Sequence, residues 1–136
     1  MTRIMAIDYG KKRVGVAITD PLCTISQPLV TIKPKSVADL IKRLKCIATE
    51  NNVGLIIVGN PVSMRGEPTE ISREVERFIK KLRNQLDIKI EPWDERYLSK
   101  YAMAKFKDAG LGMKKEDIDR VSASIMLEEY LQTKRA

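Results

Sequence analysis

The sequence predicts an α/β domain built on a mixed five-stranded sheet with helices on its faces. Three apolar segments joined by short connections come first, as in an antiparallel meander. Further apolar segments then alternate with stretches of helical periodicity. Helical crossovers of this kind place the later strands parallel to the first strand. A length of 136 residues is enough for one hydrophobic core, so residues 1–136 are expected to form a single domain.

The first three strands are expected at residues 3–9, 13–20 and 27–33. Gly10 and the two lysines after it form the turn between the first two strands, because glycine allows a tight turn. Pro34 ends the third strand, since proline has no backbone N–H to donate to a sheet.

Helices and strands alternate over the rest of the chain. Ser36 is a candidate N-cap for a helix over residues 37–51. Short apolar strands are expected at 55–58 and 87–93, with a helix between them and another over 99–109. A last helix begins at Glu116 or Asp117. The expected buried stripes are Leu40, Ile41, Leu44, Ile47 and Ala48; then Ile71, Val75, Phe78, Ile79, Leu82 and Leu86; and then Ile118, Val121, Ile125, Met126 or Leu127, and Tyr130.

The composition excludes several classes of chemistry. The chain has no histidine, which rules out histidine acid–base catalysis, a Ser-His-Asp triad and the common zinc sites. A metal would need oxygen ligands, which favours Mg²⁺ or Mn²⁺. Cys23 and Cys46 stand alone and are expected to be reduced thiols of a cytoplasmic protein. No membrane span and no signal peptide is expected.

Positive charge is concentrated in the first half of the chain. The net charge is +7, and residues 1–66 hold ten lysines and arginines against four acidic residues. Residues 67–136 hold fifteen against fourteen. A polyanion such as nucleic acid is the natural partner of such a surface. The alternative is an ordinary solvated basic surface.

Carboxylates follow or precede several of the predicted elements. Asp8 ends the first strand, Asp94 and Glu95 end the fifth, and Asp119 lies near the start of the last helix. The carboxyl ends of parallel strands share one edge of a sheet, so these groups can converge there. Clustered carboxylates repel one another unless cations bridge them, and two Mg²⁺ ions suit phosphodiester hydrolysis. The alternative is local pairing with Arg96 and a favourable helix N-terminus.

Four motifs in order make the whole chain resemble the YqgF-type family of proposed pre-16S rRNA nucleases and Holliday junction resolvases. The first motif is a D-x-G-x-K-x-x-G-V-A pattern after a strand, and the second is G-x-P-x-x-M-x-G. The third is D-E-R, and the fourth is an aspartate opening a helix that ends in a tyrosine. They occur here as residues 8–17, as residues 59–66, as Asp94, Glu95 and Arg96, and as Asp119 to Tyr130.

The resemblance implies an RNase H-like fold with strand order 3-2-1-4-5. It also implies metal binding by Asp8, Glu95 and Asp119, and a role in trimming the 5′ end of the small-subunit rRNA precursor. The chain departs from the family pattern at Tyr97 and Leu98, and Ser122-Ala123-Ser124 replaces paired alanines. Many RNase H-like nucleases also carry an acid at the end of the fourth strand, where this chain has residues 59–61.

The leading hypothesis is a Mg²⁺-dependent endonuclease acting on structured RNA or branched DNA, as a monomer or a weak homodimer. Lys12 would contact phosphate, Arg65 and Arg96 would hold the substrate backbone, and Lys11 and Arg13 would act as general electrostatic contacts. A second hypothesis is a nucleic-acid-binding factor for ribosome assembly or transcription without efficient catalysis. A third, a nucleotide-hydrolysing domain of the sugar-kinase type, requires two such domains around ATP.

Overall fold

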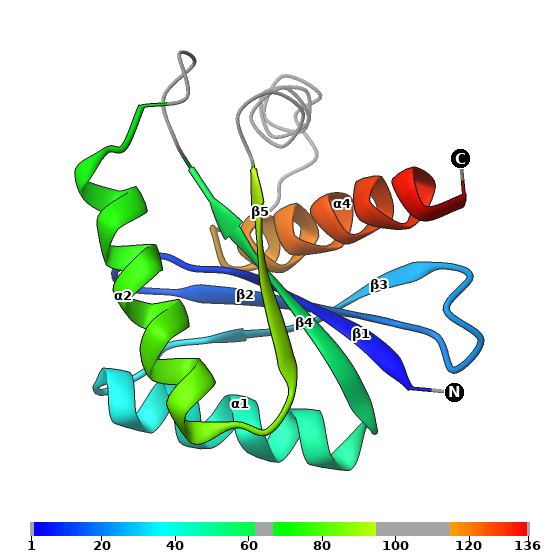
Figure 1. The fold of residues 1–136 in the computed structure, drawn as a ribbon, viewed down its shortest axis with the longest axis horizontal. Coiled ribbons are helices and arrows are strands. Elements are labelled where there is room, and N and C mark those ends of the chain that lie inside the picture. The colour runs from blue at the N-terminus through cyan, green and yellow to red at the C-terminus, as the bar shows by residue number, and fades with distance from the viewer. Residues whose placement is uncertain (1, 62–66, 95–114, 136) are drawn as a thin grey trace.

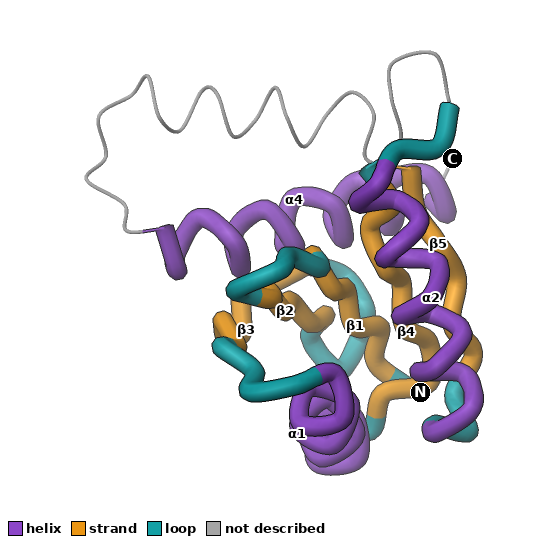
Figure 2. The backbone as a smooth tube through the Cα atoms, turned by 90° about the vertical axis from the view of Figure 1, so that its left-hand side faces the viewer, coloured by secondary structure: helices purple, strands orange, loops and turns teal. Residues whose placement is uncertain are grey.

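The computed structural model describes residues 2–61, 67–94 and 115–135. One five-stranded sheet forms its centre, in the order β3-β2-β1-β4-β5, which confirms the expected topology. The sheet lies between helices on both of its faces (Figures 1 and 2). The expected helix at residues 99–109 lies outside the described residues.

The first three strands form the antiparallel meander that the short turns predict. β1 spans Arg3–Asp8, β2 spans Val14–Thr19 and β3 spans Ser26–Ile32. β1 pairs with β2, and β2 with β3, both antiparallel. β4 (Val53–Asn60) and β5 (Lys89–Asp94) follow helical crossovers, and both lie parallel to β1. The carboxyl ends of β1, β4 and β5 therefore share one edge of the sheet.

Two helices cover one face of the sheet. α1 spans Val37–Glu50, and the hydroxyl of Ser36 accepts a hydrogen bond from the backbone N–H of Asp39, as the N-cap prediction requires. α2 spans Glu70–Gln85 and begins with a capping box between Thr69 and Ser72, which the sequence analysis did not anticipate. The predicted apolar stripes of both helices are confirmed in outline, because Leu40, Ile41, Leu44 and Ala48, and Val75, Phe78, Ile79, Leu82 and Leu86, are buried.

The two faces of the sheet carry side chains of different size. Met5 and Ile7 of β1 belong to the large hydrophobic core under α1 and α2. Ala6, which lies between them, and Ala17 of β2 face the other way and pack beneath the last helix. Because side chains alternate along a strand, each strand presents bulky residues to one layer and small residues to the other at these positions.

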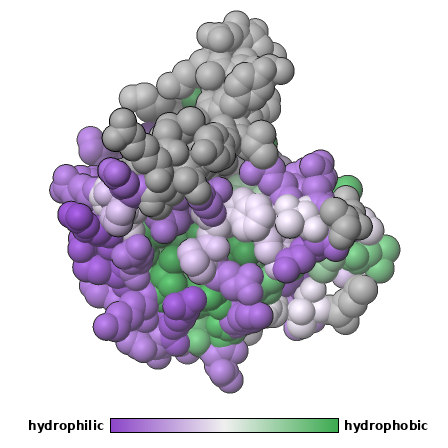
Figure 3. Space-filling model, turned by 45° about the horizontal axis from the view of Figure 1, so that its top comes forward, coloured by the Kyte–Doolittle hydropathy of each residue, from purple (hydrophilic) through white to green (hydrophobic). Residues whose placement is uncertain are grey.

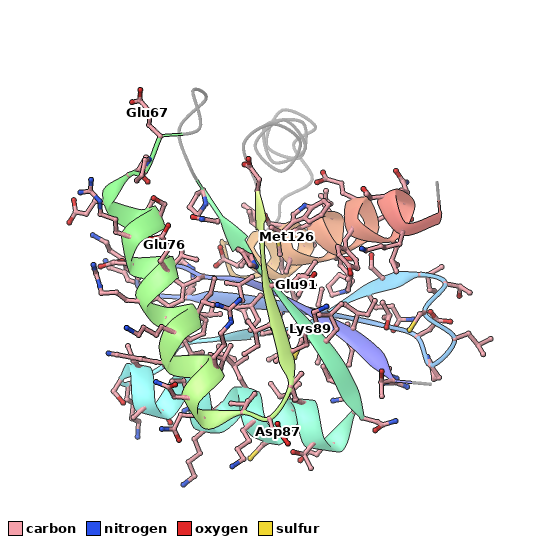
Figure 4. The ribbon with its side chains drawn as sticks, in the orientation of Figure 1. Glu67, Glu76, Asp87, Lys89, Glu91 and Met126 are labelled. Carbon is pink, nitrogen blue, oxygen red and sulfur yellow. The ribbon has the colours of Figure 1, made fainter. Side chains whose placement is uncertain are left out.

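α4 (Lys115–Arg135) covers the small-residue face, and the expected stripe is confirmed at Met126, Leu127 and Tyr130 but wrong at its first three positions. Ile118, Val121 and Ile125 are only half-buried. The buried face is instead Ser122, Ala123, Met126, Leu127, Tyr130 and Leu131. Ser122 and Ala123 lie against the sheet because their short side chains allow a close approach. Figure 4 shows Met126 where α4 crosses the sheet behind β5. None of the described helices is long and apolar enough to cross a membrane.

Candidate functional site

Asp8 is the last residue of β1 and lies at the edge that the parallel strands share. It is partly buried. Its position in the strand alternation is that of Ala6, which packs under α4, so Asp8 is presented on the α4 face. Its partner across the antiparallel pair is Gly15 of β2.

Gly15 is the point where α4 rests on the sheet. A Cβ atom at Gly15 would overlap the backbone carbonyl of Asp119 and would lie 2.8 Å from the backbone nitrogen of Arg120. Facing residues of an antiparallel pair have Cα atoms about 4.5–5.5 Å apart. Asp8 and Asp119 therefore both adjoin Gly15, on the same face of the sheet. Two of the three predicted metal ligands therefore lie on backbone that adjoins the same glycine.

Arg13 supplies a cation to this site. The Nε of Arg13 donates a hydrogen bond to Oδ2 of Asp119 at 2.8 Å, with side chains 30% and 23% exposed. The two residues are 106 positions apart in sequence, and Arg13 occupies the same side of the hairpin as Gly15. The sequence analysis treated Arg13 as a general contact for nucleic acid and Asp119 as a metal ligand, and it did not foresee that they pair.

The other predicted basic residues of the hairpin differ from Arg13 in exposure. Lys11 and Lys12 are exposed, on the turn between β1 and β2. Gly10 opens this turn, and a Cβ atom there would lie 2.5 Å from the carbonyl oxygen of Arg13. The prediction that Gly10 permits a tight turn is therefore confirmed, by close backbone approach.

Asp117, one of the further acidic residues of α4, pairs within its own helix. Its carboxylate forms an ion pair with Arg120 one turn later.

The ends of β4 and β5 lie beside Asp8. Gly59 pairs with Trp93, and Asn60 pairs with Asp94, in the parallel register. Trp93 packs on the α4 side of the sheet, where its ring meets Tyr130 edge-on at 5.4 Å. Asp94, the next residue along the strand, is presented to the opposite face. Asp94 is therefore not on the face that carries Asp8.

Three predicted site residues lie outside the described part of the chain: Glu95, Arg65 and Arg96. Within residues 2–61, 67–94 and 115–135, no group of three potential metal ligands is gathered. Asp8 and Asp119 carry hard oxygen ligands of the kind that Mg²⁺ and Mn²⁺ prefer, so their chemistry is compatible with a divalent cation. In this structure Oδ2 of Asp119 is paired with Arg13.

Tyr9 anchors the chain just beyond Asp8, a contact that the sequence analysis missed. Its ring stacks on Phe78 of α2, with ring centroids 4.7 Å apart. Burial raises the pKa of Tyr9, and the nearby Glu74 carboxylate raises this pKa further, while Arg77 lowers it. The phenol therefore stays neutral at physiological pH. The sequence feature that could have indicated this contact is the aromatic residue directly after the aspartate that ends the strand.

The surface around this edge of the sheet is largely polar where it is described. Figure 3 shows hydrophilic residues gathered over α2, on its left, with a small apolar area in the middle of the view. Exposed apolar side chains occur at the far tip of the β2–β3 hairpin, where Leu22 is 68% and Ile25 is 51% exposed.

The comparisons with known proteins agree on one family. A family model described as "RuvX: Holliday junction resolvase" matches residues 2–133. A protein of Flavobacterium psychrophilum named "Putative pre-16S rRNA nuclease" is 40% identical over 98% of this chain and 99% of its own length. A protein of Phocaeicola vulgatus with the same name is 42% identical over 99% of both chains.

Among solved structures, RuvC of T. thermophilus in complex with a Holliday junction substrate superposes with a TM-score of 0.63. It covers 100% of this chain and 97% of its own, at 13% identity. At that identity the likeness concerns the fold, which is the RNase H-like fold that the resemblance implied. The family match spans nearly the whole sequence, and it agrees with the relatives that are about 40% identical over their full length. The chain belongs to the RuvX family.

Proposed function

We propose that the chain is a divalent-metal-dependent nuclease that hydrolyses phosphodiester bonds, with the 5′ end of the pre-16S rRNA as its substrate. The observation that carries this proposal is the meeting of Asp8 and Asp119 across Gly15. Two acidic residues, one from the first strand and one from the last helix, adjoin the same glycine, and like charges placed near one another repel unless cations accompany them. A bound cation stabilises such an arrangement.

Asp8, Asp119 and Glu95 are the proposed metal ligands. Glu95 follows Asp94 directly in the sequence, and Asp94 itself is presented to the face opposite Asp8. When bound, the metal supplies a water of lowered pKa and stabilises the leaving oxygen. The absence of histidine is compatible with this chemistry, since the proton acceptor need not be a side chain.

The hairpin of β1 and β2 is the proposed surface for the nucleic-acid backbone. Lys11 and Lys12 are exposed beside the carboxylates, where they can neutralise phosphates without reading sequence. Arg65 and Arg96 are proposed to extend this contact. We expect Lys12→Ala to weaken binding uniformly across substrates and to lower the slope of log K against log salt by about 0.7–0.9.

Branched DNA is the second candidate substrate, because the family description and the RuvC-like fold both favour it. A four-way junction is symmetric, so a resolvase is expected to act as a dimer. An enzyme that trims rRNA can act as a monomer or as a weak homodimer. Sedimentation with and without a junction therefore distinguishes these states.

Cleavage tests the proposal directly. A 5′-extended rRNA precursor and a four-way DNA junction are incubated with Mg²⁺ or with EDTA. We expect the native chain to cut in Mg²⁺ alone, and Asp8→Asn to bind but not cut. Asp87→Asn is the matched control, because Asp87 lies at the opposite end of β5 (Figure 4) and is exposed. Binding without cleavage by every protein would favour a non-catalytic assembly factor, and the substrate that is cut identifies the role.

A further inference from the structure

Arg13 would compete with a metal for the carboxylate of Asp119. The guanidinium of Arg13 holds Oδ2 of Asp119 at 2.8 Å. A divalent ion bound to Asp119 would lie within a few ångströms of the guanidinium, where two positive charges repel strongly in a partly buried site. A metal bound at Oδ2 of Asp119 would therefore have to displace Arg13 from that atom.

The ion pair is poorly suited to be a structural tie alone. Gly15 and the alanines beneath α4 already fix the helix against the sheet through close packing. A partly exposed ion pair adds little to stability. Its two side chains, 30% and 23% exposed, can separate without opening the core.

We infer that Arg13 is a positioning residue that holds Asp119 in the metal-free protein and transfers to a substrate phosphate when a divalent ion takes over that carboxylate. This inference rests on the proposed function, because it requires a metal at Asp119. Lys11 and Lys12 are exposed on the same turn, so the released guanidinium joins an existing basic surface. A guanidinium matches phosphate oxygens in bidentate geometry, as it does a carboxylate.

The exchange couples metal binding to nucleic-acid binding. Without metal, the guanidinium of Arg13 is paired with Asp119 and contributes little to the affinity for nucleic acid. With metal, it becomes available to the backbone. Thermodynamic linkage then requires the nucleic acid to raise the affinity for metal by the same factor as the metal raises the affinity for nucleic acid.

Metal affinity provides the first readout, without any cleavage. Binding of Mn²⁺ to the full chain is titrated by electron paramagnetic resonance. Arg13→Ala is expected to bind Mn²⁺ about two- to fivefold more tightly, because a competing ion pair of the usual partly exposed strength is removed. Lys11→Ala removes one charge from the same turn and gives the size of the general electrostatic effect. Arg13→Lys is expected to lie between Arg13→Ala and the native chain.

A merely structural role predicts the opposite sign. If Arg13 only orients Asp119, then Arg13→Ala leaves the carboxylate misplaced and Mn²⁺ binding weakens. If Arg13→Ala binds Mn²⁺ no more tightly than Lys11→Ala does, the inference is therefore overturned. Asp119→Asn separates the two proposals. If Asp119→Asn binds Mn²⁺ like the native chain, the metal centre itself is wrong; if it loses binding while Arg13→Ala does not tighten it, only the exchange is wrong.

Nucleic-acid affinity provides the second readout. A fluorescent pre-rRNA fragment and a four-way junction are titrated in Ca²⁺, a hard cation for the same oxygen ligands, and in EDTA. Arg13→Ala is expected to lower affinity in Ca²⁺ and to leave it nearly unchanged in EDTA. Lys11→Ala is expected to lower affinity by the same factor in both. An equal loss for Arg13→Ala under the two conditions would contradict the exchange.

Discussion

At the scale of single residues, Gly15 decides whether the site exists. It lies opposite Asp8, and the backbone of Asp119 occupies the space that any side chain would need. Both groups that a Cβ atom would meet belong to the backbone of α4, so neither can rotate away. The close approach of the α4 backbone to the sheet at this point therefore depends on the absence of a side chain at residue 15.

We predict that Gly15→Ala lowers the free energy of unfolding by about 1–3 kcal/mol, the usual cost of overpacking, and also weakens Mn²⁺ binding. Urea denaturation and Mn²⁺ titration measure the two effects. Gly54→Ala is the matched control, since its Cβ atom would meet only the side chain of Thr2, an exposed residue that precedes β1, so the end of the chain would shift rather than a packed helix. Equal costs at the two glycines would show that α4 is not held by this contact.

At the scale of elements, the β2–β3 connection is organised by one carboxylate. Asp20 accepts hydrogen bonds from the backbone N–H groups of Thr24 and Ile25, at 2.6 and 2.9 Å, and from the Thr24 hydroxyl at 2.7 Å. The bond from Ile25 and then that from the Thr24 hydroxyl are the main causes that lower the pKa of Asp20 to about 2. Cys23, in the same turn, has a positive φ of 55°.

This lowered pKa gives a stability effect of known sign. The folded chain holds the Asp20 proton more weakly than the unfolded chain, so the contribution is present above the unfolded pKa of 3.8 and is lost as the pH falls through about 2. Asp20→Ala should therefore lower Tm at neutral pH. The difference in Tm between this variant and the native chain should become smaller below about pH 4. Thermal scans at several pH values test this, with Asp87→Asn as a control whose difference should not narrow in the same way.

The elements also show where sequence reasoning succeeded. Short turns and helical crossovers fix strand direction, so the mixed sheet followed from connection lengths, and the motifs supplied the strand order. α1 and α2 were predicted well because each packs one amphipathic face against the sheet. α4 was predicted in part, since Tyr130 is buried as expected, but the earlier part of its contact uses the small residues Ser122 and Ala123. Close approach, rather than hydrophobic bulk, determines which face of that helix is buried.

The site was predictable only in part, for a related reason. Asp8 could be recognised as a charge at the end of an apolar strand, and the shared edge of parallel strands explained why acids would gather. The pairing of Arg13 with Asp119 joins residues 106 positions apart, and no local periodicity carries that information. Glu95, Arg65 and Arg96 lie outside the described residues, so their roles stay predictions.

At the scale of the whole molecule, the sheet is asymmetric. Bulky side chains such as Ile7 separate the sheet from α1 and α2. The small side chains of Ala6, Ala17 and Ala123 lie between the sheet and α4. The layer that carries the carboxylates is thus the closely packed one. Little movement of α4 is possible toward the sheet.

We predict that Ala17→Leu destabilises the chain by about 1–3 kcal/mol, because Ala17 is fully buried opposite Ala6 under α4. Ala38→Leu makes the same change at an exposed position of α1 and should alter stability by no more than about 0.5 kcal/mol. Urea denaturation of the two variants gives the comparison. A neutral effect at Ala17 would mean that α4 can move outward at no cost.

The long sequence separation of the Arg13–Asp119 contact has a consequence for folding order. The β1–β2 hairpin closes over a few residues, whereas docking α4 on that hairpin closes a loop of about a hundred, which costs more chain entropy and forms later on average. Local unfolding of α4 would remove Asp119 while leaving Asp8 in its strand. The two proposed metal ligands therefore adjoin Gly15 together only in the completely folded chain, and we expect a partly folded molecule to lack the proposed centre.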